Sequence, residues 1–471
     1  YTLFDTQARL LIEPLVCGNE TVVRIGGYEQ ETLIYPIAYA RIDGAWQAVD
    51  LVGGQKRGAW IAQTAAATIQ ESGDFGLAAY VCQRVAGNWK CGCSDASCQR
   101  NQWTYQVITT PDSGHLGDEW RDKYNGKWLM GYYPAWDLDR LEPEDIAWEY
   151  LTHIAFGALA PLSDGEVDHD FAMPGESGDR LAKRVSQEAK EHEVIPMLFV
   201  GGGSHGRNGW VGATSPARVE TFARNLIAVM DDLGYLGIDI DWEPLYEDDL
   251  PQIRDLAQEL KRQRPSIVLS MAVPARNENL GDPSTGYDYL ADEFDQINIM
   301  TYDMGGAWAS WDVWHHSALD GEGDDNPTSI ESSVRLYRGI GVPKAKLGIG
   351  APFYGYCWQG DAELGTPVAG NIKTNGAMSY RLIRRDYYDQ DFYEYDRRAD
   401  ADYLLFEEPT GVDDCTMISY MDERSAEARA KWAKNEHVGG IIVWSLGQAH
   451  MDEYTKSRRH PLLRALAEGL D

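Results

Sequence analysis

The chain reads Leu-Gly-Ile-Asp-Ile-Asp-Trp-Glu at residues 236–243, with an acidic side chain at every second position from Asp239 onward. Successive residues of a β-strand face opposite sides, so this spacing places Asp239, Asp241 and Glu243 on one face. Such alternation would be ordinary on a surface strand. A strand enclosed in a parallel sheet normally reads as a continuous apolar run, so acids in an enclosed strand indicate a function.

Short apolar segments alternate with longer amphipathic ones on both sides of this stretch. The amphipathic segments predict helices, for example over residues 178–192, 216–233, 250–264, 329–341 and 425–436. The apolar segments predict eight strands, at 128–133, 153–159, 195–200, 236–241, 267–273, 296–302, 346–351 and 440–446. This alternation predicts an α/β fold, a (β/α)8 TIM barrel, in which the acids of the fourth strand face the barrel interior.

The carboxyl ends of barrel strands are where catalytic residues gather. Three carboxyl groups stacked in one barrel interior repel one another, and together with burial this raises at least one pKa. Glu243 is the outermost of the three. We therefore expect Glu243 to hold a proton at neutral pH, as a general acid requires.

Aromatic and polar residues mark several other predicted strands. They are Tyr133 on the first strand, Phe156 on the second, Met300, Tyr302 and Asp303 at the sixth, Tyr354 after the seventh and Trp444 in the eighth. Rings with polar tips around a carboxylate suit a sugar, whose C–H faces stack on rings while its hydroxyls meet acids and amides. A single such ring is more often core packing, but their shared position favours a binding site.

Between the seventh and eighth predicted strands the chain is too long for one connection. We predict a small α+β domain inserted at residues 358–415, with the barrel formed by residues 126–357 and 416–471. Cys357 and Cys415 flank the insertion. Either a disulfide closes its neck or the two are unrelated buried thiols.

The first 112 residues consist of short alternating runs broken by Gly and Asp. They predict a small β-rich domain, possessing disulfides and joined to the barrel by a linker at 113–125. The chain has seven cysteines, most of them in this region, and their spacing favours disulfides over a zinc site; the connectivity stays open. The tryptophans of the domain either form its small core or present rings to an insoluble polysaccharide.

The formal net charge of −32 arises from 74 acidic and 42 basic residues. A surface of this sign repels nucleic acids and anionic membranes, whereas a neutral substrate is indifferent to it. No apolar run of about 18 residues marks a membrane span, and residues 1–12 do not form an export signal. The adjacent His315 and His316 have no acidic or cysteine ligand at helpful spacing. We predict a secreted monomer that needs no metal and no other cofactor.

Residues 236–243 resemble the DxxDxDxE signature of glycoside hydrolase family 18, and specifically that of its chitinases. The resemblance covers residues 126–466 and includes the glycines 201–202, Met-Thr-Tyr-Asp at 300–303, Trp308, and the segments 350–355 and 439–445. It implies a retaining, substrate-assisted mechanism in which the N-acetyl oxygen of the sugar is the nucleophile and an oxazolinium ion forms.

The resemblance also implies a role for each candidate residue. Glu243 would protonate the glycosidic oxygen and later activate water. Asp241 would hold the acetamido N–H and share a proton with Asp239, and Tyr302 would donate a hydrogen bond to the acetamido carbonyl. Trp444 would form the floor under the distorted sugar. The full set of expected substrate contacts is Tyr133, Phe156, Met300, Asp303, Trp308, Tyr354 and Trp444.

The chain departs from the family pattern at two places. Leu236 replaces the first acid of the signature, which should ease ionisation of Asp239 and shift the acid limb of the pH profile downward. Residues 203–206 lack the aromatic side chain that family members often carry beside the strand-three glycines, so we expect one stacking platform to be missing. Trp311 and Trp314 are expected to pack within their loop.

These features predict a chitinase that hydrolyses β-1,4 linkages of N-acetylglucosamine polymers, with chitin or its oligosaccharides as partner. An endo-β-N-acetylglucosaminidase or a peptidoglycan-directed hydrolase would use the same acid, but the inserted domain favours a long groove and hence chitin. A chitin-binding lectin on an inactive scaffold is the third reading. Such lectins typically lose the donor carboxylate, whereas this chain has Glu243.

Overall fold

The computed structural model divides the chain into two compact units, residues 1–115 and 116–471. It describes residues 123–471 apart from 174–176, 204, 276–285 and 327, and between residues 2 and 109 it describes the backbone of β-strands. No helix in these described parts is both long and apolar enough to cross a membrane.

The first unit consists, where it is described, of antiparallel strands. One sheet has the order β10-β9-β5-β6 with β11 also paired to β9, another has the order β3-β4-β8-β7, and β1 pairs with β2. Their bounds are β1 (Thr2–Phe4), β2 (Ala8–Arg9), β3 (Leu11–Cys17), β4 (Glu20–Gly26), β5 (Thr32–Ile42), β6 (Ala45–Val49), β7 (Val52–Lys56), β8 (Ala59–Thr64), β9 (Asp74–Val85), β10 (Asn88–Gly92) and β11 (Gln106–Thr109). The disulfides predicted for this region, and the role of its tryptophans, lie outside the described side chains.

The second unit is built around a closed parallel barrel. In the described part of the chain the strand order is β12-β25-β19-β18-β17-β16-β15-β13, and pairing of β12 with β13 closes the ring. The bounds are β12 (Trp128–Pro134), β13 (His153–Pro161), β15 (Ile195–Gly201), β16 (Gly237–Asp241), β17 (Val268–Pro274), β18 (Gln296–Met300), β19 (Leu347–Pro352) and β25 (Gly440–Trp444). A short strand, β14 (Val167–Asp168), pairs antiparallel with the end of β13. Each predicted strand falls on one barrel strand, and the TIM barrel is confirmed.

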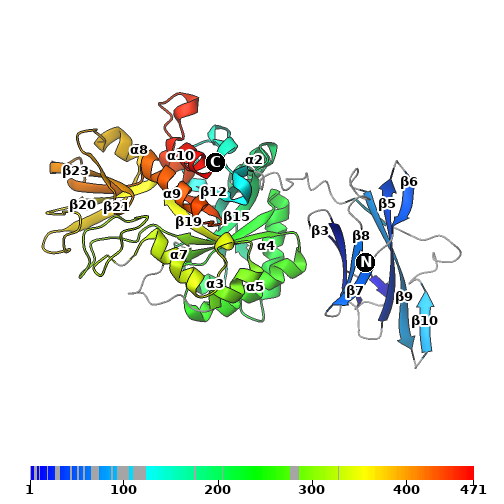
Figure 1. The fold of residues 1–471 in the computed structure, drawn as a ribbon. Helices are drawn as coiled ribbons and strands as arrows, with labels where there is room; N and C mark the ends of the chain where they lie inside the picture. The colour runs from blue at the N-terminus through cyan, green and yellow to red at the C-terminus, as the bar shows by residue number, and fades with distance from the viewer. Residues whose placement is uncertain are drawn as a thin grey trace. The chain divides into compact units, whose positions relative to one another are not determined.

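Helices surround the barrel strands (Figure 1). They are α2 (Ser177–Glu191), α3 (Arg207–Ala213), α4 (Val219–Leu233), α5 (Leu250–Gln263), α6 (Gly286–Glu293), α7 (Ile330–Gly339), α9 (Glu423–Asn435) and α10 (Pro461–Leu470). In α5 the buried residues Ile253, Leu256 and Leu260 recur at helical spacing. They belong to the same core as Ile238 and Ile240 of β16, so the strand turns its apolar face toward the helices.

A second, antiparallel sheet is inserted between β19 and β25, with the order β21-β20-β24-β23-β22. Its elements are β20 (Tyr354–Gln359), β21 (Lys373–Ser379), α8 (Tyr380–Leu382), the π-helical turn Ile383–Tyr387, β22 (Tyr393–Asp396), β23 (Ala401–Thr410) and β24 (Cys415–Tyr420). The predicted α+β insertion is therefore present, and it lies at one side of the barrel in Figure 1 (yellow to orange). Of the two alternatives for its cysteines, the disulfide is the one found: Cys357 is bonded to Cys415, with Cα atoms 5.4 Å apart.

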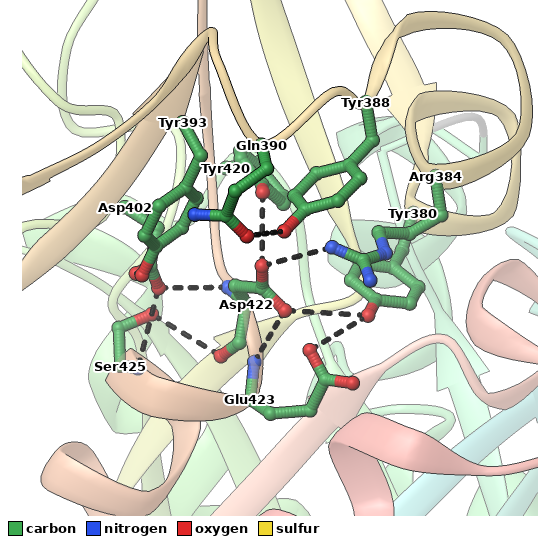
Figure 2. Close-up of polar contacts among 10 residues, drawn as sticks. All are labelled: Tyr380, Arg384, Tyr388, Gln390, Tyr393, Asp402, Tyr420, Asp422, Glu423 and Ser425. Atoms are coloured by element: carbon green, nitrogen blue, oxygen red, sulfur yellow. Dashed lines mark hydrogen bonds and ion pairs between the residues drawn. The ribbon is translucent and has the colours of Figure 1, made fainter. Parts of the chain in front are cut away.

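A polar network ties the inserted sheet to the barrel helix α9 (Figure 2). Asp422, the N-cap of α9, accepts hydrogen bonds from Tyr420 Oη at 3.0 Å and from Arg384 Nη1 at 3.2 Å. Asp402 of β23 accepts from the backbone N–H of Asp422 at 2.9 Å and from Tyr393 Oη at 2.6 Å. Buried carboxylates are costly unless they are hydrogen-bonded, so these contacts stabilise one orientation of the insertion on the barrel.

Candidate active site

Strand β16 directs its carboxyl groups into the barrel interior. Asp239 and Asp241 are only 0% and 4% exposed. Their neighbours Ile238 and Ile240 pack in the layer between strands and helices, so the two acids project to the opposite side. Alternation along one strand therefore stacks carboxyl groups in a space that water hardly reaches.

Asp239 is the deepest carboxyl group of the stack. Tyr132 Oη donates a hydrogen bond to its Oδ2 at 2.6 Å, and Ser270 Oγ donates to its Oδ1. Burial raises the pKa of Asp239 to about 6, although these two hydrogen bonds favour the ionised form. Asp239 is thus ready to exchange a proton near neutral pH.

Asp241 lies in the middle of the stack. Its Oδ1 is buried and has no hydrogen-bond partner among the described residues. Burial raises the pKa of Asp241 well above the usual range, and the charges of Glu243 and Asp239 raise it further. Gly202, at a left-handed φ of 90°, borders Asp241: a Cβ added there would lie 3.5 Å from Oδ2. An unpaired buried acceptor at this place is available to a ligand N–H.

Glu243 lies just beyond the end of β16, at the wall of a cavity of about 530 Å³. Burial raises the pKa of Glu243, a hydrogen bond from the backbone N–H of Gly203 lowers it, and the charge of Asp303 raises it. The net direction is upward. Besides Glu243, the cavity is lined by Pro274, Ala275, Met300, Tyr302, Asp303, Met304, Trp308, Trp311 and Thr328.

Tyr302 is carried to the cavity by the segment that follows β18. Thr301 anchors this segment, because its Oγ1 donates to Gly350 O at 3.1 Å and accepts from Gly350 N at 2.8 Å. A Cβ on Gly350 would lie 2.7 Å from the ring of Tyr302, so only glycine lets the ring lie against β19. Burial raises the pKa of Tyr302 well above its usual value, and the charges of Asp241 and Glu243 add to this. Its hydroxyl therefore remains a hydrogen-bond donor.

Asp303 follows Tyr302 and is held from behind. Its Oδ1 accepts hydrogen bonds from Tyr354 Oη at 2.6 Å and Tyr356 Oη at 2.9 Å. Burial alone would raise the pKa of Asp303, but His316 and the two tyrosine hydroxyls outweigh burial and hold it below its usual value. Asp303 is therefore the ionised carboxylate of the cavity. Its negative charge favours the protonated form of Glu243, which lines the same cavity.

Aromatic rings surround the acids on two sides. Trp444, at the end of β25, packs against Tyr132 and Phe199 of the barrel interior, with ring centroids 5.5 and 6.1 Å away. At the cavity wall Trp308 is 44% exposed and meets Trp311 edge to face at 4.8 Å. Trp311 thus lines the cavity, contrary to the expected packing role, whereas Trp314 is buried as expected.

Two predicted substrate contacts do not reach the cavity. Tyr133 and Phe156 are 0% exposed and belong to the core between strands and helices, with their rings 6.0 Å apart. Tyr133 Oη donates to Leu141 O at 2.6 Å. The expectation for both residues is wrong because neighbouring residues of a strand face opposite sides, and the inward residues of β12 and β13 are Tyr132 and Ala155.

The structure brings the remaining candidates together and adds others. Asp239, Asp241, Glu243, Tyr302, Met300, Asp303, Trp308, Tyr354 and Trp444 lie on the barrel interior, on the cavity wall or directly behind it. Sequence reasoning missed Ser270, Tyr132, Tyr356 and His316. Tyr132 had a signal, its place beside Tyr133 at a strand end. The other three come from strands and loops far from the acidic motif, and their proximity depends on the closed barrel and the insertion.

Comparison with known proteins agrees with this geometry. The model of "Glycosyl hydrolases family 18" matches residues 128–449. Chitinase 1 of Aphanocladium album is 25% identical over 380 residues, which cover 72% of this chain and 85% of that protein. The crystal structure of the Ostrinia furnacalis group IV chitinase superposes with a TM-score of 0.63 at 22% identity, covering 73% of this chain and 99% of that one.

A structural relative of another kind is human YKL-39, described as a pseudo-chitinase with retained chitooligosaccharide binding. It superposes with a TM-score of 0.61 at 20% identity, covering 73% of this chain and 99% of that one. The same barrel fold thus occurs in a chitinase and in a pseudo-chitinase. The family match spans more than half of the chain and includes the acidic strand and every residue of the cavity wall. The chain belongs to glycosyl hydrolase family 18.

Proposed function

We propose that the protein hydrolyses the β-1,4 linkages of chitin by a retaining, substrate-assisted mechanism with Glu243 as acid and base. The observation that carries this proposal is the stack on β16, with Glu243 at the cavity wall and two buried carboxyl groups behind it. Burial and the charge of Asp303 raise the pKa of Glu243, so its carboxyl group starts protonated and donates to the glycosidic oxygen.

The buried position of Asp241 argues for the sugar's own acetamido oxygen as the nucleophile. A carboxylate nucleophile must reach the anomeric carbon, whereas Asp241 is 4% exposed and stands behind Glu243 on the same strand face. Its Oδ1 lacks a partner and suits the acetamido N–H. The acetamido oxygen then attacks the anomeric carbon as the leaving-group oxygen takes the proton of Glu243, and an oxazolinium ion forms.

Water completes the reaction from the face of the sugar on which Glu243 lies, opposite to the oxazolinium ring. Glu243, now ionised, takes a proton from a water molecule, whose oxygen attacks the anomeric carbon and reopens the oxazolinium ring. The negative charge that Asp241 acquires by passing its proton to Asp239 stabilises the positive intermediate, and Asp239 has a pKa of about 6 for this purpose. The hydroxyl of Tyr302 donates to the acetamido oxygen.

Chitin is favoured as the substrate by the rings around the acids. Trp308 and Trp311 line the cavity, and Trp136, in the turn that follows β12, is 51% exposed. Exposed rings of this kind stack on the C–H faces of successive sugars. The disulfide of the insertion favours an oxidising compartment, which supports the proposal that the protein is secreted and meets its polymer outside the cell.

Product analysis with chitin hexamer tests the proposal. The parent protein should release shorter oligomers, whereas Glu243→Gln should bind the hexamer and lose about 10²- to 10⁴-fold in rate. A parent that binds but does not cleave would identify a lectin like the pseudo-chitinase. Cleavage of a high-mannose glycoprotein in preference to the hexamer would identify an endo-β-N-acetylglucosaminidase.

A further inference from the structure

A buried histidine lies behind Asp303 and has no place in the mechanism above. The side chain of His316 is 1% exposed, and neither of its ring nitrogens has a hydrogen-bond partner within the described part of the chain. Buried polar groups are nearly always paired, so an unpaired imidazole at the back of an active site indicates a function.

The imidazole points at one oxygen of Asp303. His316 Nδ1 lies 3.8 Å from Asp303 Oδ1, the oxygen that also accepts hydrogen bonds from Tyr354 and Tyr356. The rings of these tyrosines lie 5.3 and 4.9 Å from the imidazole. Three side chains thus converge on Oδ1, which leaves Oδ2 for the cavity that Asp303 lines.

We propose that His316 is a positioning residue for substrate binding: with Tyr354 and Tyr356 it fixes Oδ1 of Asp303 and keeps this carboxylate ionised in mildly acidic solution, so that Oδ2 accepts a hydroxyl or N–H of the bound sugar. The proposal deepens the proposed function and rests on it, because the sugar is taken to occupy this cavity.

The charges around His316 explain why the pair responds to acid. Asp303 faces the imidazole from the loop after β18, His315 precedes it in the chain, and Arg429 faces it from α9. Arg429 is 2% exposed and donates to backbone carbonyl groups. Burial lowers the pKa of His316, Asp303 raises it, and Arg429 and His315 lower it.

The imidazole is therefore neutral at neutral pH and gains a proton only on acidification. The new positive charge appears beside Asp303 under the same conditions in which that carboxylate would otherwise be neutralised. His316 and the two tyrosine hydroxyls lower the pKa of Asp303 against the effect of burial, so without His316 the carboxylate would be neutralised at a higher pH.

The affinity for chitin hexamer, measured in the Glu243→Gln background from pH 7 to pH 4.5, tests the proposal without interference from hydrolysis. His316→Phe should weaken binding progressively as the pH falls, by about tenfold at the acid end, because the positive charge that the protonated imidazole places beside Asp303 is lost. His316→Gln retains an N–H donor of similar reach and should match the parent at pH 7. Affinities of His316→Phe that parallel those of the parent at every pH would overturn the proposal.

His315 provides a matched control. It is equally buried and adjacent, but its nitrogens face Asp396 at 3.3 Å and Ser419 at 3.3 Å, away from Asp303. His315→Gln should leave the pH dependence of binding unchanged. A shift like that of His316→Phe would show a general loss of packing and overturn the specific role.

A second measurement separates this inference from the proposed function. Proton NMR follows the titration of the His316 ring in the protein without sugar, in the parent and in Asp303→Asn. Removing the carboxylate should lower the pKa of His316, since Asp303 favours its protonated form. An unchanged titration overturns the pairing even if the parent cleaves chitin, whereas a shifted titration with no hexamer bound at any pH removes the proposed function and with it the sugar contact.

Discussion

Whether a residue of a barrel strand belongs to the active site or to the packed core depends on the face of the strand from which its side chain projects. Tyr132 and Tyr133 are neighbours of the same type on β12, yet one bonds to Asp239 in the barrel interior and the other to Leu141 O on the helix side. Chemistry and core packing therefore separate at adjacent positions. Residue type alone does not tell on which face of a strand an aromatic side chain lies, and for this reason the sequence misplaced Tyr133 and Phe156. The three acids of β16 could be placed because their spacing fixes them on one face.

The two tyrosines give a direct test of this distinction. Tyr132→Phe removes a donor that favours ionised Asp239, so the pKa of Asp239 should rise above about 6 and kcat should fall by about tenfold. Tyr133→Phe removes a hydrogen bond outside the barrel interior. It should cost about 1 kcal/mol of unfolding free energy and leave kcat unchanged. The reverse pattern, in steady-state kinetics and denaturant unfolding, would show that the strand faces are misassigned.

Leu236 gives a second test at the scale of the residue. Its side chain packs against the apolar cluster of the barrel interior, near the deep end of the acidic stack. Leu236→Asp adds a negative charge that disfavours ionisation of Asp239, so the acid limb of the kcat/KM profile should move to higher pH by roughly one unit. Leu236→Asn, similar in size but uncharged, is the control and should leave that limb in place. Equal profiles for both variants would mean that the site does not sense charge at position 236.

Elements of secondary structure could be predicted well because their signals are local. Alternating apolar and amphipathic segments located every barrel strand, and the excess length after β19 located the inserted sheet. The wall of the cavity could be predicted only in part. Tyr356 and His316 reach Asp303 from β20 and from a long loop, and no periodicity in the sequence connects those segments. Such contacts arise from packing of elements that are distant along the chain.

The C-terminal helix α10 is predicted to be sensitive to acid. His460, the N-cap of α10, donates a hydrogen bond from Nε2 to Asp145 O at 2.7 Å, and its ring stacks on the ring of His450 with the centroids 5.0 Å apart. Since a backbone carbonyl only accepts, Nε2 carries the proton. Burial lowers the pKa of His460 to about 4, and the neighbouring His450 contributes.

The sign of the effect follows from the lowered pKa. Unfolded histidine titrates near 6.5, so the unfolded chain takes up this proton before the folded one. The contribution of neutral His460 to the free energy of unfolding is therefore complete above about pH 6.5. As the pH falls toward 4, the free energy of unfolding should decrease by about 3 kcal/mol. Urea unfolding between pH 7 and pH 4 measures it. His460→Gln keeps an N–H for Asp145 O and should flatten this part of the dependence; an equally steep loss in the variant would assign the acid sensitivity elsewhere.

The whole molecule carries a large net negative charge, which should not affect the binding of a neutral substrate. The net charge is −32, whereas a chitin oligomer is neutral. Coulombic steering depends on salt only when the ligand is charged. We therefore expect kcat/KM for neutral chitin oligomers to change by less than about twofold between low and moderate salt.

Partly deacetylated oligomers provide the contrast, because their amines are positively charged. Their KM should rise as salt screens the attraction to the acidic surface. Stopped assays at constant pH over a salt series measure both. A strong salt dependence for the neutral oligomer would show that the acidic surface takes part in binding it.

The central claim is that Glu243 delivers a proton while the acetamido group of the sugar attacks from the opposite face. Proton NMR during the first turnovers of chitin hexamer tests it most directly, because it records the configuration of each new reducing end before mutarotation. The parent should produce the β-anomer, and Glu243→Gln should produce almost no new reducing ends. An initial α-anomer, or cleavage by Glu243→Gln at the rate of the parent, would contradict the claim.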